Sequence, residues 1–297
     1  MTRKIIVIAQ CLTLLFLTAN FSLAADTKKE TSAKKKETPK KEACTKCAKK
    51  KETAKKDACT KCAKKEEAKP DLCPKVPKDG IVLLDDKKCE FVLMDGSEPI
   101  DWPLEKGILT SSGGKRRHHS NHIVSKYHFR DAKIHVEFLL PKETAGNSGI
   151  YIHGGYEMQI LASNDVKDAD LKQTHCGALY GFGEPLTNAL LARDKWQTYD
   201  IWYTAPRWDK EGKVTTPGKV TAYLNGKLVQ KDTEINDPRS GYRPWKYKTT
   251  DWLGKIHKNW KATSVAPVFL QDHGNPVKFR NVWLQPLDKE GFYYKEK

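Results

Sequence analysis

Apolar and polar residues alternate with a period of two along much of the chain beyond residue 80, which is the pattern of half-buried β-strands. Ile134, Val136 and Phe138, for example, are separated by single polar residues. No segment keeps a long helical period, and turn residues separate the alternating runs. We therefore predict strands at 81–84, 123–125, 133–140, 146–153, 156–160, 198–203, 220–224, 228–229, 267–271 and 277–286.

One of the predicted turns is itself a signal for strand pairing. Asn225-Gly226 follows Leu224 and precedes Leu228, and this dipeptide favours the tight turn of a β-hairpin. The roughly 210 residues between 80 and 291 are enough for one hydrophobic core. The predicted fold is therefore all-β, an antiparallel two-sheet sandwich.

The segment 146–160 is the most informative part of the chain. It contains two short predicted strands joined through Gly154-Gly155, and in the second strand Glu157 and Gln159 alternate with apolar residues. Successive side chains of a strand point to opposite faces, so this carboxylate and this amide share one face. They form either the floor of a polar site or a solvated edge of the sheet.

A second polar cluster ends the predicted strand 267–271. Gln271, Asp272 and His273 follow one another there, and Gln271 and His273 face the same side if the strand continues. Histidine is the side chain most easily used for proton transfer near neutral pH. The alternative is a structural histidine at a strand end.

The N-terminus carries an export signal. Arg3 and Lys4 precede an apolar run over residues 5–17 and a small-x-small pattern at 22–24, as in a secretory signal peptide spanning residues 1–25. No later stretch approaches the roughly 18 apolar residues that a membrane span needs. The mature protein is expected to be secreted or periplasmic, without a transmembrane segment.

Residues 26–70 have a different composition. They contain 17 Lys and 8 Asp or Glu, with no aromatic or branched aliphatic residue, so we predict a disordered lysine-rich linker. Its charge is 17 − 8 = +9 and the signal peptide adds +2, which leaves 16 − 9 − 2 = +5 for residues 71–297. The basic pI therefore does not indicate a nucleic-acid binder, although the tail is expected to contact anionic envelope polymers.

The tail contains a repeated Cys-x-x-Cys unit with a period of 15. Four thiolates of this kind could hold a zinc ion, but an oxidising compartment favours disulfides equally, and the repeat could also be a plain spacer. A disulfide between Cys73 and Cys89 could close a small loop, and Cys176 would then be unpaired. The four repeat cysteines are Cys44, Cys47, Cys59 and Cys62.

Three loops carry further candidate side chains. Residues 236–265 hold five Trp and Tyr residues that either bind sugar rings or cover one end of the sandwich. The segment 115–119 with His122 is interpreted as a mobile basic loop, and His175 as a loop histidine. His153 lies just before the glycine turn and close enough in sequence to Glu157 to be a further site candidate.

The order and spacing of eight short motifs resemble the 3-keto-disaccharide hydrolase family over residues 80–288. The motifs occupy residues 146–151, 156–160, 177–180, 196–200, 205–209, 225–226, 270–274 and 279–283. The resemblance implies a concanavalin A-like jelly-roll sandwich in residues 71–297, with a sugar site on the concave sheet.

Proteins similar to this one act on glycosides already oxidised to a ketone at C3, so a separate oxidoreductase must supply the substrate. The C3 carbonyl acidifies the C2 hydrogen. A base removes that hydrogen, the enolate expels the C1 substituent by β-elimination, and water then adds back to give net hydrolysis. An ordinary glycosidase instead needs two carboxylates.

The resemblance also distributes roles over this chain. Glu157 and His273 are the candidates for base or metal ligand, two roles that stay open between them, and His153 is a further candidate ligand. The implied cation is Ca²⁺, Mn²⁺ or Zn²⁺, with no organic cofactor. For Arg280 the alternative is a cross-strand ion pair. The candidates for substrate contact are Asn147, Gln159, Tyr180, Gln271, Asp272 and Arg280.

Two other classes of function fit the same pattern. A lectin-like module of this fold would bind glycans without turning them over, and fold alone does not decide between the two. A structural envelope protein held by its tail is the third possibility.

Overall fold

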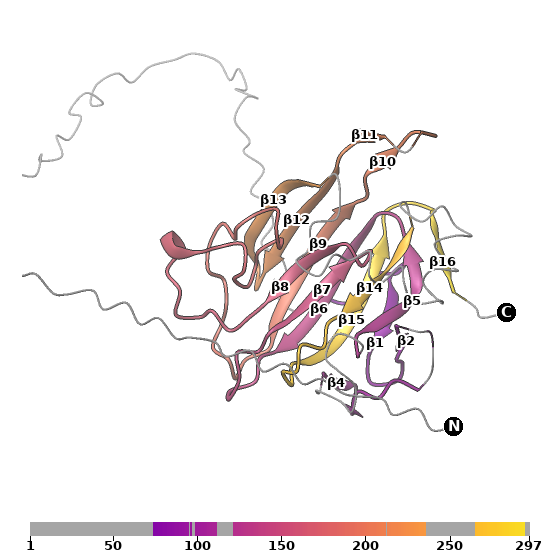
Figure 1. The fold of residues 1–297 in the computed structure, drawn as a ribbon. Helices are drawn as coiled ribbons and strands as arrows, with labels where there is room; N and C mark the ends of the chain where they lie inside the picture. The colour runs from indigo at the N-terminus through magenta and orange to yellow at the C-terminus, as the bar shows by residue number, and fades with distance from the viewer. Residues whose placement is uncertain are drawn as a thin grey trace, which may run out of the picture. The chain divides into compact units, whose positions relative to one another are not determined.

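The computed structural model describes residues 74–94, 96, 99–111, 121–211, 213–235 and 265–294, which build an antiparallel sandwich of two sheets (Figure 1). The predicted signal peptide, lysine-rich linker and Cys-x-x-Cys repeats lie outside these residues and stay predictions. One short 3₁₀ helix, Asp168–Asp170, occurs in the described part. Within that part, no helix has the length and apolar character to cross a membrane.

The larger sheet has eight strands, whose order puts β6 and β15 at its centre. Its bounds are β1 Ile81–Leu84, β3 Leu104–Glu105, β4 Ile108–Thr110, β6 Ala132–Leu139, β9 Gln197–Thr204, β12 Gly218–Leu224, β13 Lys227–Ile235 and β15 Lys278–Pro286. Its main path runs β13-β12-β9-β6-β15-β4-β3, and β1 also pairs with β15.

The smaller sheet has six strands and carries the informative segment 146–160. Its bounds are β2 Phe91–Leu93, β5 Ile123–Phe129, β7 Ser148–Ile152, β8 Tyr156–Ile160, β14 Ala266–Leu270 and β16 Gly291–Tyr293. The order is β16-β5-β14-β7-β8, with β2 on β5 (Figure 1). A separate ribbon joins β10, Arg207–Trp208, to β11, Val214–Thr216.

The core lies between the two sheets. Ile134 and Val136 of β6 and Ile150, Ile152 and Met158 of the smaller sheet belong to one buried cluster and are fully shielded from solvent. Each such side chain stabilises the fold by about 1.5–3 kcal/mol relative to an exposed one. The alternation read from the sequence is thus the alternation between this core and the outer faces.

The predicted antiparallel two-sheet sandwich is confirmed, and so is the hairpin at Asn225-Gly226. Both turn residues have positive φ, 51° and 75°, as the tight turn between β12 and β13 requires. The strand predicted at 123–125 runs on to Phe129. Its pairing with β14 shifts register between Val124 and His128, and this irregularity interrupts the alternation that would have shown its length.

Candidate functional site

The smaller sheet has an outer face that points away from the main core. Tyr151 of β7 lies opposite Glu157 of β8 and next to Phe269 of β14. Tyr151 and Phe269 belong to a small buried cluster with Val124, separate from the main core. Because the neighbouring residues of these strands fill the main core, Glu157 points to the outer face with Tyr151.

A second row of side chains lies beside the first on this outer face. The backbone N–H of Gln271 donates to the carbonyl of Gly149 at 3.0 Å, which continues the pairing beyond the end of β14. Gly149 lies opposite Gln159. Gln159 and Glu157 therefore share a face, as predicted, and Gln271 joins them from the neighbouring strand.

Glu157 is a buried carboxyl group with only 2% of its surface exposed. Burial raises its pKa to about 8, although a hydrogen bond from Tyr151 acts in the opposite direction. Its Oε2 has no hydrogen-bond partner among the described residues. A carboxyl group of this kind is poised to exchange a proton near neutral pH, which is a property of general bases.

Gly149 provides the space that the Glu157 carboxylate occupies. A Cβ atom at position 149 would lie 3.0 Å from Glu157 Cγ and 3.1 Å from Cδ, and closer still to Oε1. Real Cβ atoms essentially never come closer than 3.0 Å to another atom, as this one would to Oε1, and contacts of 3.0–3.4 Å are tighter than nine in ten real ones. The glycine of the Gly-Asn-Ser-Gly motif is therefore explained here by side-chain packing, without any special backbone angle.

His122 is a member of this face that the sequence analysis did not identify. It is fully buried, and its Nδ1 accepts the backbone N–H of Asp272 at 3.1 Å. Because Leu270 lies opposite Ile123, the next pair of positions puts His122 beside Gln271. The basic residues before it led to its interpretation as part of a mobile loop, and its proximity to Ile123 was the signal that could have indicated a strand end.

Asn147, His273 and Tyr180 lie around these rows and are half-buried. Extending the pairing of Gln271 with Gly149 by one more step puts His273 next to Asn147. The backbone N–H of Tyr180 donates to the carbonyl of Glu157 at 2.9 Å, so residue 180 flanks the outer edge of β8. The structure thus places Glu157, Gln159 and Gln271 on one face with Tyr180 at its edge, and Asn147 and His273 lie in the segments that precede β7 and follow β14.

Two predicted residues have different roles. His153 lies in the turn between β7 and β8, where its ring contacts Phe129 and Tyr203 of the main core. Its Nε2 lies 2.7 Å from the Phe129 carbonyl oxygen, and its Nδ1 lies 3.0 Å from the Tyr203 hydroxyl. This geometry removes it as a metal ligand beside Glu157. Asp272 is fully buried and accepts hydrogen bonds from Asn121 Nδ2 and the Gly274 N–H, so it shapes the turn.

Arg280 lies on the other sheet and is also removed from the site. It forms the cross-strand ion pair considered above, with its Nε 2.6 Å from Glu137 Oε2, and its guanidinium lies over the Trp196 ring at 4.0 Å. Burial alone would raise the pKa of Glu137, but hydrogen bonds from His135, Asn281 and Arg280 outweigh it and lower the pKa to about 2.

We expect Arg280→Ala to lower the free energy of unfolding by about 3 kcal/mol at pH 7, because it leaves a buried carboxylate with weaker compensation. Glu137 has a depressed pKa, so its contribution is present above about pH 4.5 and is lost as the pH falls towards 2. The difference from wild type should therefore shrink in acid. Urea denaturation at several pH values measures this, with exposed Lys278→Ala as the control; equal losses for both variants would contradict it.

The described residues do not assemble a metal site. No group of three His, Cys, Asp or Glu side chains that could hold a metal ion is found there, and the side chain hydrogen-bonded to Glu157 is the phenol of Tyr151. The divalent cation implied by the family resemblance stays a prediction, and we derive no step through a metal.

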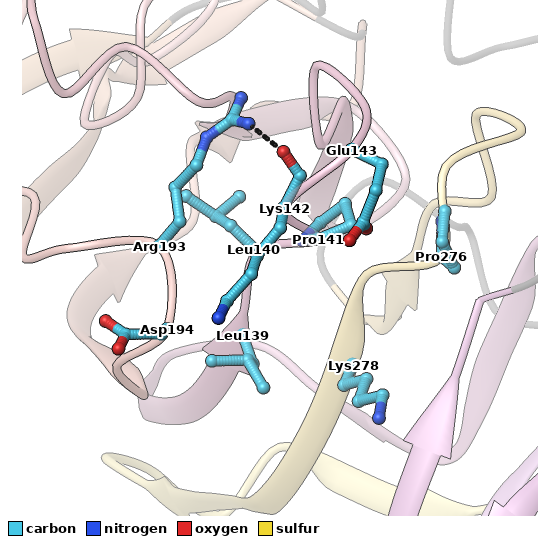
Figure 2. Close-up of a pocket in the computed structure, with 9 residues that line it drawn as sticks. All are labelled: Leu139, Leu140, Pro141, Lys142, Glu143, Arg193, Asp194, Pro276 and Lys278. Atoms are coloured by element: carbon cyan, nitrogen blue, oxygen red, sulfur yellow. Dashed lines mark hydrogen bonds between the residues drawn. The ribbon is translucent and has the colours of Figure 1, made fainter.

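A cavity of about 360 Å³ lies at the end of β6, away from these residues (Figure 2). Leu139, Leu140 and Pro141 form its apolar wall, and Lys278 and Arg193 are among its charged residues. Figure 2 shows the Arg193 guanidinium donating to the Lys142 carbonyl, at 2.6 Å. None of the candidate residues lines this cavity, so the site is placed on the outer face of the smaller sheet.

Several other predictions concern cysteines and loops. Cys176 is fully buried near the Tyr199 hydroxyl, and burial raises the pKa of its thiol to about 11, so it is not a reactive nucleophile. His175 Nδ1 accepts the Lys172 N–H, as expected for a loop histidine. Cys73, residues 115–119 and nearly all of the aromatic loop 236–265 lie outside the described residues.

Comparisons with known proteins find similar solved structures. A solved structure from Parabacteroides distasonis, provisionally named a glycosyl hydrolase, is 28% identical with a TM-score of 0.56, and the match covers 71% of this chain and 85% of that one. A second, similarly named structure from that organism is 19% identical with a TM-score of 0.46, over 70% of this chain and 94% of that one. A comparison with curated proteins finds no match.

The sequence model of one family matches residues 81–285, which contain both sheets apart from the last residue of β15 and the whole of β16. The match includes every residue of the outer-face site: His122, Asn147, Tyr151, Glu157, Gln159, Tyr180, Gln271 and His273. The chain therefore belongs to the family of 3-keto-alpha-glucoside-1,2-lyase-like domains.

Proposed function

We propose that this protein cleaves 3-keto-glycosides by β-elimination followed by hydration, with Glu157 as the base. The observation that carries the proposal is a buried carboxyl group with a pKa of about 8, on a polar sheet face within a domain of this family. Glu157 is the single carboxylate in the two rows of the outer face, which are Tyr151, Glu157 and Phe269 in one and Gly149, Gln159 and Gln271 in the other. The arrangement fits chemistry that needs one base and does not supply the carboxylate pair of an ordinary glycosidase.

In this reaction the Glu157 carboxylate takes the C2 proton of the sugar. The electron pair of the C2–H bond forms the enolate, whose charge rests on the C3 oxygen, and then expels the C1 substituent. Water adds at C1 of the resulting enone, and Glu157 returns the proton to C2. His122 and His273 are the side chains of this face that can carry a proton to the leaving oxygen or donate to the C3 oxygen.

The proposal also includes the setting of the reaction. An oxidoreductase acting earlier must convert the C3 hydroxyl of the glycoside to a ketone, since the C2 proton is not acidic without it. The proposal takes the predicted signal peptide to export the enzyme, so that it meets its substrate outside the cytoplasm.

We expect purified protein to release nitrophenol from nitrophenyl 3-keto-glucoside but not from nitrophenyl glucoside, which lacks the acidifying ketone. Because the base must be ionised, kcat/KM should rise with pH and level off above about 8. Spectrophotometric assays between pH 5 and 9.5 measure both. Binding of the keto sugar without release at any pH would contradict the proposal and favour the lectin-like alternative.

A further inference from the structure

Gln271, Tyr151 and Glu157 form a chain of hydrogen bonds across three neighbouring strands. Gln271 Nε2 donates to the Tyr151 hydroxyl at 3.1 Å, and the Tyr151 hydroxyl is hydrogen-bonded to the Glu157 carboxyl group. Gln271 and Tyr151 are fully buried and Glu157 is 2% exposed. These contacts are therefore made away from bulk water, where each polar atom needs a partner.

When Glu157 is ionised, as the proposed reaction requires, the chain fixes the orientation of the Gln271 amide. A phenol has one proton, and the ionised Glu157 carboxylate can only accept, so the Tyr151 proton must point to Glu157. The Tyr151 oxygen then has to accept from the amide group of Gln271. Rotating the amide would turn Gln271 Oε1 towards Tyr151. The single Tyr151 proton would then face two acceptors, Oε1 and the Glu157 carboxylate, and the –NH₂ group would have no acceptor on this side.

The opposite side of the amide is left with an unused acceptor. Gln271 Oε1 is buried and has no hydrogen-bond partner among the described residues. A buried acceptor without a donor destabilises the protein, and a bound donor would remove that cost. Gln271 lies beside Gly149, whose missing side chain leaves the space that the Glu157 carboxylate occupies.

We propose that Gln271 Oε1 accepts a hydrogen bond from a ring hydroxyl of the substrate, and that Tyr151 is the positioning residue that holds it in this orientation. This inference rests on the proposed function for the identity of the sugar. Gln271 Oε1 is an acceptor, so it cannot stabilise the negative C3 oxygen of the enolate. That role belongs to a hydrogen-bond donor elsewhere on the face. The selected substrates carry a free hydroxyl at the position facing Gln271.

The test compares nitrophenyl 3-keto-glucoside with its 2-deoxy, 4-deoxy and 6-deoxy forms. For wild type, we expect one deoxy substrate to lose about 100-fold or more in kcat/KM, because it leaves Oε1 unpaired. In Gln271→Leu that ratio should fall below about 3-fold, and in Tyr151→Phe to an intermediate value. A ratio of two substrates on one enzyme does not change when part of the protein is misfolded, so it separates positioning from stability.

Gln285→Leu is the matched control, on β15 of the larger sheet. Gln285 Nε2 donates to Asp79 Oδ1 at 2.9 Å, away from the outer face of the smaller sheet, so its removal should leave the deoxy ratio unchanged. The inference is overturned if no deoxy substrate is penalised by wild type, or if Gln271→Leu keeps the wild-type ratio.

Calorimetric binding of the corresponding glucosides without the ketone separates this inference from the proposed function. If wild type turns over no keto sugar but binds one deoxy glucoside about 100-fold more weakly than glucoside, the Gln271 assignment stands and the proposed reaction falls. If it neither turns over nor binds any member of the series, both fall.

Discussion

Glu157→Gln is expected to reduce kcat/KM for nitrophenyl 3-keto-glucoside by about 10³-fold while the protein stays folded. Glutamine has the same shape and can still accept the Tyr151 proton, but it cannot take a proton from C2, and general-base catalysis contributes about 10²–10⁴-fold. Nitrophenol release at the pH optimum of wild type measures the loss. The exposed carboxylate variant Glu184→Gln serves as the control and should keep full activity.

The same substitution should raise the free energy of unfolding at pH 8, although it lowers activity. The pKa of Glu157 is about 8 in the folded protein and about 4.5 in the unfolded chain, so the folded state holds its proton more tightly and wild type loses stability as the pH rises from 4.5 to 8. That loss is on the order of 4 kcal/mol. Glu157→Gln has no such group, so it should unfold at a higher urea concentration than wild type at pH 8 and at a similar one at pH 4.5.

A variant that lost activity and stability together at pH 8 would contradict the assignment. That result would mean that Glu157 is ionised and paired in the folded protein, as Glu137 is on the other sheet. The two carboxyl groups are both almost fully buried, yet their pKa values move in opposite directions because only Glu137 has an arginine and a histidine beside it.

The strand pattern predicted the sandwich and the shared face of Glu157 and Gln159 because both depend on the two-residue period alone. The shared side of Gln271 and His273 followed from the same rule, once the strand was assumed to continue. Very short strands such as β3 and β10 were not predicted, because two residues carry no period. His122 was missed for a related reason: it follows a run of basic residues, and its burial depends on pairing with Gln271, far away in sequence.

Where the chain turns, position in the sequence does not give the direction of a side chain. His153 and Asp272 are neighbours of site residues in sequence, but the left-handed turn at His153, with φ of 55°, directs its ring to the core, and Asp272 points away from Gln271. Arg280 was assigned through a family motif, and its partner Glu137 became visible only with the register of β6 and β15. Tyr151 lies in the motif 146–151, but the sequence indicates no role for it, since its hydrogen bonds join three strands.

Gly149→Ala is expected to lower kcat/KM by about 100-fold. The added methyl group would occupy the space of the Glu157 carboxylate, lying 3.0 Å from Cγ and 3.1 Å from Cδ, so the carboxylate must move by a few tenths of an ångström or more. A displacement of about 1 Å at a reacting group costs about 10²-fold. The backbone of Gly149 does not have positive φ, so alanine is otherwise compatible with β7 and the effect should come from the side-chain clash.

A thermodynamic cycle with Glu157→Ala isolates that clash. Gly149→Ala alone should destabilise the protein by about 1–3 kcal/mol, as expected for overpacking. In the Glu157→Ala background the carboxylate is absent, so the same methyl group should cost little or even stabilise the strand, giving strong non-additivity in urea denaturation. Equal costs in both backgrounds would show that the glycine serves the strand itself, and that the Glu157 carboxylate does not depend on the space beside Gly149.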